Sequence, residues 1–125
     1  MKVIRRAEAV GPGPDGDLER FTGHVSHLRL WAPPADAQSS NVSVVRFDRG
    51  VRGSWHTHSG GQLIHVLEGE GVIGLRDAEP VRLGPGDSVA LEPGEEHWHG
   101  TAPGAELAHM AISYGSLTWL EGPEC

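Results

Sequence analysis

Short runs in which apolar and polar residues alternate recur along most of the chain, separated by Gly, Pro and Asp. The pattern predicts strands at 20–31, 41–48, 62–68, 71–76, 79–83, 87–92, 96–101 and 105–114. No helical period of 3.6 residues persists for more than about two turns. Strands this short, with turn signals at spacings of about 8–12 residues, are typical of an all-β sandwich or barrel.

The turns between these strands indicate one domain with flexible ends. Pro-Gly corners precede strands in LGPGDSV (83–89) and LEPGEEHWHG (91–100). The composition of 11–17 predicts a connector and that of 32–40 a loop. We therefore expect an N-terminal arm and connector at 1–19, a β-barrel domain at 20–120 and a C-terminal tail at 121–125.

Composition excludes several classes of function. The 125 residues suit a single domain, and 17 acidic against 10 basic residues argue against a nucleic-acid partner. The chain has no run of about 18 apolar residues and no apolar segment typical of a signal peptide, so we expect no membrane span and a cytoplasmic location. The single cysteine, Cys125, cannot form an internal disulfide.

Histidine carries the candidate chemistry. Five of the eight histidines lie in three short segments between residues 56 and 109, namely His56, His58, His97, His99 and His109. Strand residues two apart point to the same face, so three strands could direct imidazoles into one interior. Neutral imidazole is the commonest ligand of transition metals.

The remaining histidines have simpler interpretations. We interpret His24, His27 and His65 as core or surface residues, because single histidines often pack with one nitrogen bonded to the backbone. The His56–His58 pair taken alone is equally compatible with a metal site and with an incidental surface pair. The later HWH segment at 97–99 favours the metal site.

Two motifs in this region resemble those of the cupin superfamily. The first is G-x5-H-x-H-x3-Q-x6-G at 50–69, and the second is G-x5-EPG-x2-H-x3-T at 86–101. The resemblance implies a single-domain jelly-roll β-barrel with one divalent transition metal ion in its mouth. It also implies the ligands His56, His58, Gln62 and His97.

The chain departs from the usual pattern at three positions. Gln62 replaces a glutamate, Glu92 a proline and Thr101 an asparagine. Three neutral imidazoles and an amide leave a divalent ion about two positive charges, against about one with a carboxylate. Such a centre binds anions better and is a stronger Lewis acid. Alternatively, Gln62 points away and the site has three histidine ligands.

A narrower resemblance concerns activity. The phrases FTG (21–23), SWHTH (54–58), PGEEHWHG (93–100) and AHMAI (108–112) are similar to small bacterial cupins that act as manganese-dependent hydroxynitrile lyases. This resemblance implies His109 as a general base with a near-neutral pKa and His99 as a second proton carrier or orienting residue. Manganese is the expected metal, with iron, nickel, cobalt, zinc and copper as alternatives.

Three functions follow as hypotheses. The leading one is a metal-dependent lyase acting on a small aldehyde or cyanohydrin, of which an isomerase is a variant. The alternatives are a metal-dependent oxygenase and a barrel that binds a small ligand without catalysis. We expect pocket walls at Phe21, Thr22, Trp31, Val44 and Trp98.

The expected partners are a small-molecule substrate and further copies of the chain. Small cupins commonly pair by exchanging N-terminal strands, and residues 1–10 could form such an arm. We expect a homodimer or a tetramer.

Overall fold

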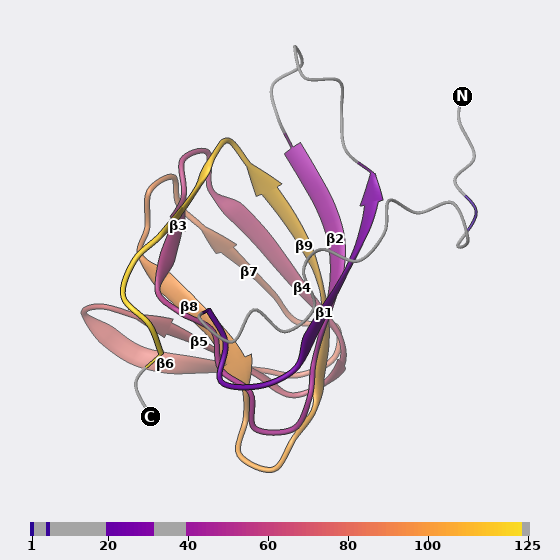
Figure 1. Ribbon diagram of the computed structural model, residues 1–125, viewed down its shortest axis with the longest axis vertical. Helices are drawn as coiled ribbons and strands as arrows, with labels where there is room; N and C mark the ends of the chain where they lie inside the picture. Colours follow the sequence, from indigo (N-terminus) through magenta and orange to yellow (C-terminus); the bar gives the residue numbers. More distant parts are fainter. Residues whose placement is uncertain (2–4, 6–19, 32–39, 124–125) are drawn as a thin grey trace.

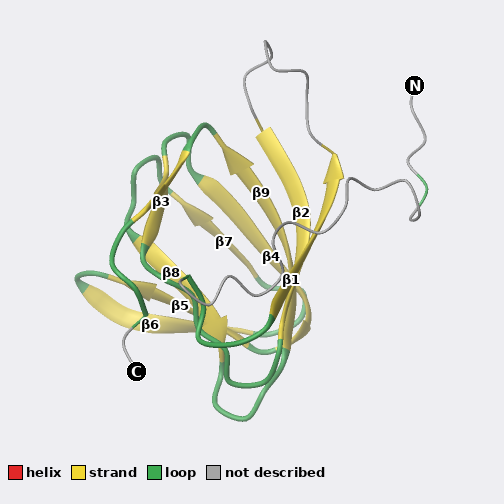
Figure 2. Cartoon of the chain, in the orientation of Figure 1, coloured by secondary structure: helices red, strands yellow, loops and turns green. Residues whose placement is uncertain are grey.

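The computed structural model describes residues 1, 5, 20–31 and 40–123. These residues form strands and loops without a helix (Figure 1, Figure 2). The strands are β1 (Val25–Trp31), β2 (Ser40–Phe47), β3 (His56–His58), β4 (Gln62–Gly69), β5 (Gly71–Leu75), β6 (Ala78–Leu83), β7 (Ser88–Leu91), β8 (His97–Thr101), β9 (Leu107–Tyr114) and β10 (Leu117–Trp119). Within this part of the chain, no helix is long and apolar enough to cross a membrane.

The strands form two antiparallel layers. One five-stranded sheet has the order β1-β2-β9-β4-β7, and the other has the order β10-β3-β8-β5-β6 (Figure 1). The predicted all-β jelly-roll class is confirmed. The closed barrel is not found, because the edge strands of one sheet are not paired with those of the other among the described residues.

Strict alternation explains why the sheets have one buried face. In β4, Gln62, Ile64 and Val66 are buried, while Leu63 and Leu67 are exposed. A strand presents successive side chains to opposite faces, so this sequence covers the interior with every second residue. Gln62 is the polar member of the buried row and thus faces the same interior as Ile64.

An apolar core fills one part of the space between the sheets. It consists of Phe21, Val25, Val45, Phe47, Val51, Ile64, Val66, Ile73, Leu83, Leu91, Leu107 and Ala111. Register explains its position, because Val25, Phe47, Leu107 and Gly69 lie opposite one another across β1, β2, β9 and β4. Gly69 has a φ of 79°, and a Cβ there would clash with the backbone carbonyl of Glu106.

The predicted segments and the observed strands differ at their ends. Each of the eight predicted segments overlaps one strand, with ends that differ by one or two residues in most cases, but β1 begins at Val25 rather than at residue 20. The three-residue strands β3 and β10 were not among those segments. The predicted loop at 32–40 is wrong at Ser40, which begins β2, and its other residues lie outside the described part of the chain.

Most residues of the predicted N-terminal arm and connector, and the last two residues of the predicted tail, lie outside the part of the chain that the structure describes. The structure describes only Met1 and Arg5 of the arm and connector at 1–19, and it does not describe Cys125. Strand exchange through residues 1–10 and the homodimer or tetramer therefore stay predictions.

Trp98 faces away from the cavity, contrary to the prediction that it forms a pocket wall. It lies between His97 and His99 on β8, so alternation turns it to the other face of the sheet. There it lies opposite Gly74 on β5, and the Arg52 guanidinium stacks 3.7 Å from its ring centroid. Glycine leaves the space that the indole fills, because a Cβ on Gly74 would overlap the Trp98 ring.

We therefore expect Gly74→Ala to lower the free energy of unfolding by roughly 1–3 kcal/mol, the usual cost of overpacking. Urea unfolding followed by tryptophan fluorescence measures it. Gly84→Ala is the matched control, because a Cβ there meets nothing closer than the Asp87 carboxylate oxygen at 3.8 Å. Equal stability of the two variants would contradict the packing argument.

Candidate metal centre

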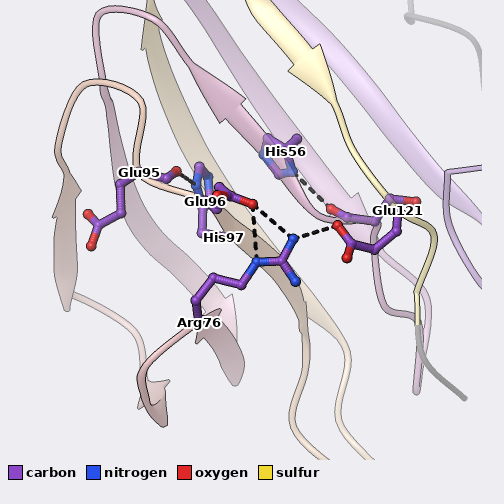
Figure 3. Close-up of polar contacts among 7 residues, drawn as sticks. His56, Arg76, Glu95, Glu96, His97 and Glu121 are labelled. Carbon is purple, nitrogen blue, oxygen red and sulfur yellow. Dashed lines mark hydrogen bonds and ion pairs between the residues drawn. The ribbon is translucent and has the colours of Figure 1, made fainter.

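A pair of histidines forms the centre of the site. His56 on β3 and His97 on β8 lie directly opposite each other in register, with ring centroids 4.3 Å apart. Nδ1 of His56 lies 2.9 Å from the Ser54 carbonyl oxygen, and Nδ1 of His97 lies 2.8 Å from that of Glu95 (Figure 3). A Nδ1–H that donates to a carbonyl leaves Nε2 with a free lone pair, the usual arrangement of a metal ligand.

Two more imidazoles lie next to this pair, each two residues further along its strand. The ring centroid of His58 lies 5.1 Å from that of His56, and the ring of His99 stacks on that of His97 at 4.9 Å. In the described part of the chain, the buried Nε2 atoms of His58 and His99 have no hydrogen-bond partner. Ligand atoms of His56, His97 and His99 lie within 4.8 Å of one another, so these three residues could hold a metal ion.

Gln62 reaches the same centre from the opposite sheet. Its Oε1 lies 3.1 Å from Nε2 of His97, and its Nε2 donates a 2.8 Å hydrogen bond to Oγ of Ser113 on β9. Because Nδ1 of His97 donates to Glu95, neither Oε1 of Gln62 nor Nε2 of His97 carries a hydrogen, and two acceptors at this distance repel each other. A cation shared by both removes the repulsion.

The donor set fits a divalent transition metal. Two ligands bound at right angles to one ion, each at about 2.1 Å, lie about 3 Å apart, close to the separation of Gln62 Oε1 from His97 Nε2. The predicted ligands His56, His58, Gln62 and His97 thus lie in one buried group. The three-histidine cluster contains His99 in place of His58, so the position of the rings alone leaves two ligand sets.

His109 lies beside this group on β9. Its side chain is 1% exposed, and its ring packs edge-on against Phe47 at 5.4 Å and against His99 at 5.3 Å. Its buried Nδ1 has no hydrogen-bond partner within the residues that the structure describes. His109 is therefore separated from the paired histidines by His99.

Burial keeps all five imidazoles uncharged. It lowers the pKa of His56 to about 3 and that of His58 to about 4. Repulsion from His97, when that ring is protonated, lowers both pKa values as well. It lowers the pKa of His97 and, more strongly, that of His99. The near-neutral pKa expected of His109 is not found, because burial, and then His27, lower it to about 3.

A cavity of about 130 Å³ opens onto these side chains. This volume suits a few waters or a molecule about the size of benzene. Its walls are Phe21, His27, Asn41, Ser43, Val45, Phe47, Gly53, His56, His58, Gln62, His99, His109, Ala111, Ser113, Leu117 and Trp119. The walls combine aromatic rings with neutral polar groups, and no carboxylate from the described part of the chain is among them.

Some of the predicted walls are wrong. Phe21 lines the cavity, but Thr22 and Val44 do not. Thr22 instead accepts a hydrogen bond from the Arg52 backbone N–H at 2.8 Å, and Val44 lies on the other face of β2 from Val45. The side chain of Trp31 lies outside the described part of the chain.

Ten of the wall residues were not predicted from sequence, and three of them make contacts that matter for the site. His27, interpreted from sequence as a core or surface residue, lines the cavity from β1, with its ring 6.0 Å from that of Phe21. Trp119 on β10 packs its ring 5.0 Å from that of His56. Ser113 fixes the direction of the Gln62 amide. The alternation of Val25 with His27 was the available signal for His27, but Leu28 and Leu30 favoured the other face.

We expect acid to destabilise the metal-free protein. Its buried histidines take up protons well below pH 6.5, the ordinary value, with pKa values of about 3 for His56 and about 4 for His58. Between pH 6.5 and these lower pKa values, the unfolded chain binds more protons than the folded chain does. The free energy of unfolding therefore falls as the pH falls. Each such histidine adds a slope of up to about 1.4 kcal/mol per pH unit.

Urea unfolding of chelator-treated protein at pH 7.5, 6 and 5 measures this slope. The variant His109→Gln removes one titrating group, so its slope should be shallower by about one proton. Stability that stays constant from pH 7.5 to 5 would contradict burial of neutral imidazoles.

Comparison with known proteins agrees with the fold and the motifs. A mandelonitrile lyase, named as the (R) enzyme, from Granulicella tundricola is 39% identical over 119 residues, which cover 92% of this chain and 88% of the relative. An acireductone dioxygenase from Rhodopseudomonas palustris is 34% identical over 47 residues, 35% of this chain and 28% of that protein.

Solved structures resemble the chain over almost its whole length. A cupin-like protein from Thermotoga maritima has a TM-score of 0.82 and 33% identity, covering 98% of this chain and 90% of that one. A polyketide cyclase from Streptomyces resistomycificus has a TM-score of 0.71 at 20% identity, with coverage of 100% and 87%, a likeness of fold alone. Residues 43–114 match the family described as Cupin domain. The chain therefore belongs to the cupin family.

Proposed function

We propose that this cupin is a metal-dependent lyase that cleaves a small cyanohydrin into an aldehyde and hydrogen cyanide, or joins the two. The observation that carries the proposal is the buried group of neutral donors beside a cavity of about 130 Å³. The 39% identity with a mandelonitrile lyase over most of both chains supports this reaction rather than another cupin chemistry.

The proposed ligands of the metal are His56, His58, Gln62 and His97. Ring orientation favours His58 over His99 only slightly, because the His97 plane is tilted by 35° to that of His58 and by 25° to that of His99. The choice of His58 therefore rests mainly on the histidine spacing of the first cupin motif. A divalent ion, manganese in this proposal, would supply Lewis-acid stabilisation of negative charge at this centre.

His109 is the proposed base. Its Nδ1 is buried without a partner in the described residues, and its ring lies on the cavity wall. Its pKa of about 3 leaves the ring uncharged at neutral pH but makes it a weaker base than the near-neutral imidazole expected. It would take the hydroxyl proton of the cyanohydrin as the O–H electron pair forms the carbonyl. The carbon–carbon bond breaks, and its electron pair leaves with cyanide. The proton taken up by His109 then passes to cyanide, which leaves as hydrogen cyanide, and His109 is neutral again. His99, between His109 and His97, would orient the base.

The cavity walls support a small, largely apolar substrate. Phe21, Phe47 and Trp119 present aromatic rings, with that of Phe21 6.0 Å from that of Trp119. A phenyl group packs favourably at such edges, where ring centroids prefer separations of about 4.5–7 Å. Benzaldehyde cyanohydrin, which is mandelonitrile, is therefore the first substrate to test.

The second candidate is an oxygenase. It is favoured by the partial match to an acireductone dioxygenase, which covers 35% of the chain. Oxygen consumption separates the two, since cyanohydrin cleavage uses none. A barrel that binds a ligand without turnover would show neither reaction.

We expect the protein loaded with manganese to release benzaldehyde and cyanide from mandelonitrile without oxygen uptake. His109→Ala should keep the metal and lower kcat by about 10²- to 10⁴-fold, the usual contribution of general acid–base catalysis. Benzaldehyde absorbance and elemental analysis measure the two effects. His65→Asn is the control, since His65 bonds to Ser88 and does not line the cavity. Full turnover by His109→Ala would remove it from the mechanism.

Paired substitutions decide between the two ligand sets. We expect His58→Ala to lose most of the bound manganese and His99→Ala to keep it, because His58 belongs to the proposed ligands and His99 does not. Metal per chain after dialysis against metal-free buffer measures both, with circular dichroism as the check on folding. The opposite result would assign the ion to His56, His97 and His99.

A further inference from the structure

Arg76 makes an unusual set of contacts outside the cavity. It lies in the turn between β5 and β6, and its side chain is 34% exposed. Its Nε and Nη2 donate to Oε1 of Glu96 at 3.1 and 2.9 Å, and Nη2 also donates to Oε1 of Glu121 (Figure 3). The guanidinium stacks 3.7 Å from the ring centroid of Trp55. One side chain thus joins three separate segments.

Two of these segments carry the central histidines. Trp55 directly precedes His56, and Glu96 directly precedes His97. The third segment is tied to the first, because the Trp55 backbone N–H donates to the Glu121 carbonyl oxygen at 3.1 Å. Arg76 therefore holds, from outside, the two backbone segments whose inner side chains meet in the site (Figure 3).

Backbone contacts between these two segments lie mainly to either side of the central histidines. The pairing between β3 and β8 consists of the single register pair His56–His97. Backbone hydrogen bonds flank this pair, from Gly53 to the His99 carbonyl oxygen and from Gly94 to the His58 carbonyl oxygen. Arg76 adds side-chain contacts to this backbone frame at the two residues that directly precede the central histidines.

We propose that Arg76 is a positioning residue of the metal centre, which fixes His56 and His97 at the separation that one ion requires. The inference rests on the proposed metal centre. A guanidinium suits this task, because its rigid fork binds a carboxylate with two N–H groups while its face stacks on an aromatic ring. Lysine keeps the charge but has neither the fork nor the plane.

The sign of the effect separates positioning from electrostatics. Removing a positive charge near a cation site strengthens cation binding if Coulomb repulsion dominates. Loss of positioning weakens it. Partners that orient metal ligands from outside typically change metal affinity by about 10- to 100-fold when they are substituted.

We expect Arg76→Gln to weaken binding of manganese by about 10- to 100-fold and Arg76→Lys to restore only part of it. Isothermal titration of the metal-free, full-length protein with Mn²⁺ measures the affinity. Arg82→Gln is the matched control, because Arg82 belongs to the same hairpin and pairs with Glu70. Glu96→Gln should weaken binding in the same direction, and Arg76→Gln with Glu96→Gln together should add little to either alone.

Urea unfolding without metal provides the second readout. Positioning requires that Arg76→Gln, like Arg82→Gln, is fully folded without metal at the temperature of the titration and still binds manganese more weakly. Equal or tighter metal binding by Arg76→Gln, or a loss of affinity found only under conditions in which the variant is partly unfolded, overturns the proposal. If the unmodified protein itself binds no manganese, the proposed metal centre fails first, which is a distinct result.

Discussion

The interior of this protein depends on five imidazoles that share a buried space without a counter-charge. Burial holds their pKa values below the ordinary range, and no carboxylate lines the cavity among the described residues. Neutral rings suit the apolar surroundings, but Nε2 of His58, Nε2 of His99 and Nδ1 of His109 have no hydrogen-bond partner among the described residues. A bound cation would supply a partner for those of these nitrogens that carry a lone pair. The apolar core has to hold this costly arrangement of polar groups in place.

In the two histidine motifs, both faces of the chain segment contribute to the structure of the site. In each, histidines face the cavity and a tryptophan lies next to them on the opposite face, Trp55 in the first and Trp98 in the second. An arginine covers each indole, Arg76 over Trp55 and Arg52 over Trp98, both at 3.7 Å from the ring centroid. Alternation thus couples a polar interior to an outer face on which a guanidinium group covers each indole.

Features that depend on the spacing of residues along one strand were predictable from the sequence. Features that depend on which strands pair with each other were not. Histidines two residues apart on a strand necessarily share a face, so the gathering of three histidine segments at one interior was predictable. The interpretation of His27 was wrong because both sets of alternating positions in VSHLRL contain apolar residues, Val25 in one and Leu28 with Leu30 in the other. Only the pairing of β1 with β2 decides which set faces inward. Strand β10 was missed because three residues carry almost no periodicity. Contacts of Arg76 with residues 20 and 45 positions away leave no local signal at all.

The amide of Gln62 explains why Ser113 matters to the site. A glutamate would present an oxygen to an ion in either orientation, whereas an amide presents an oxygen in one and an N–H group in the other. The hydrogen bond from Gln62 Nε2 to Ser113 Oγ removes this ambiguity and directs Oε1 at His97. With an amide in place of a carboxylate, a divalent ion bound here would keep its full double charge and would attract an anion more strongly. Cyanide and a developing alkoxide are both anions. A neutral ligand set, which would favour anion binding in this cavity, therefore suits the proposed lyase chemistry.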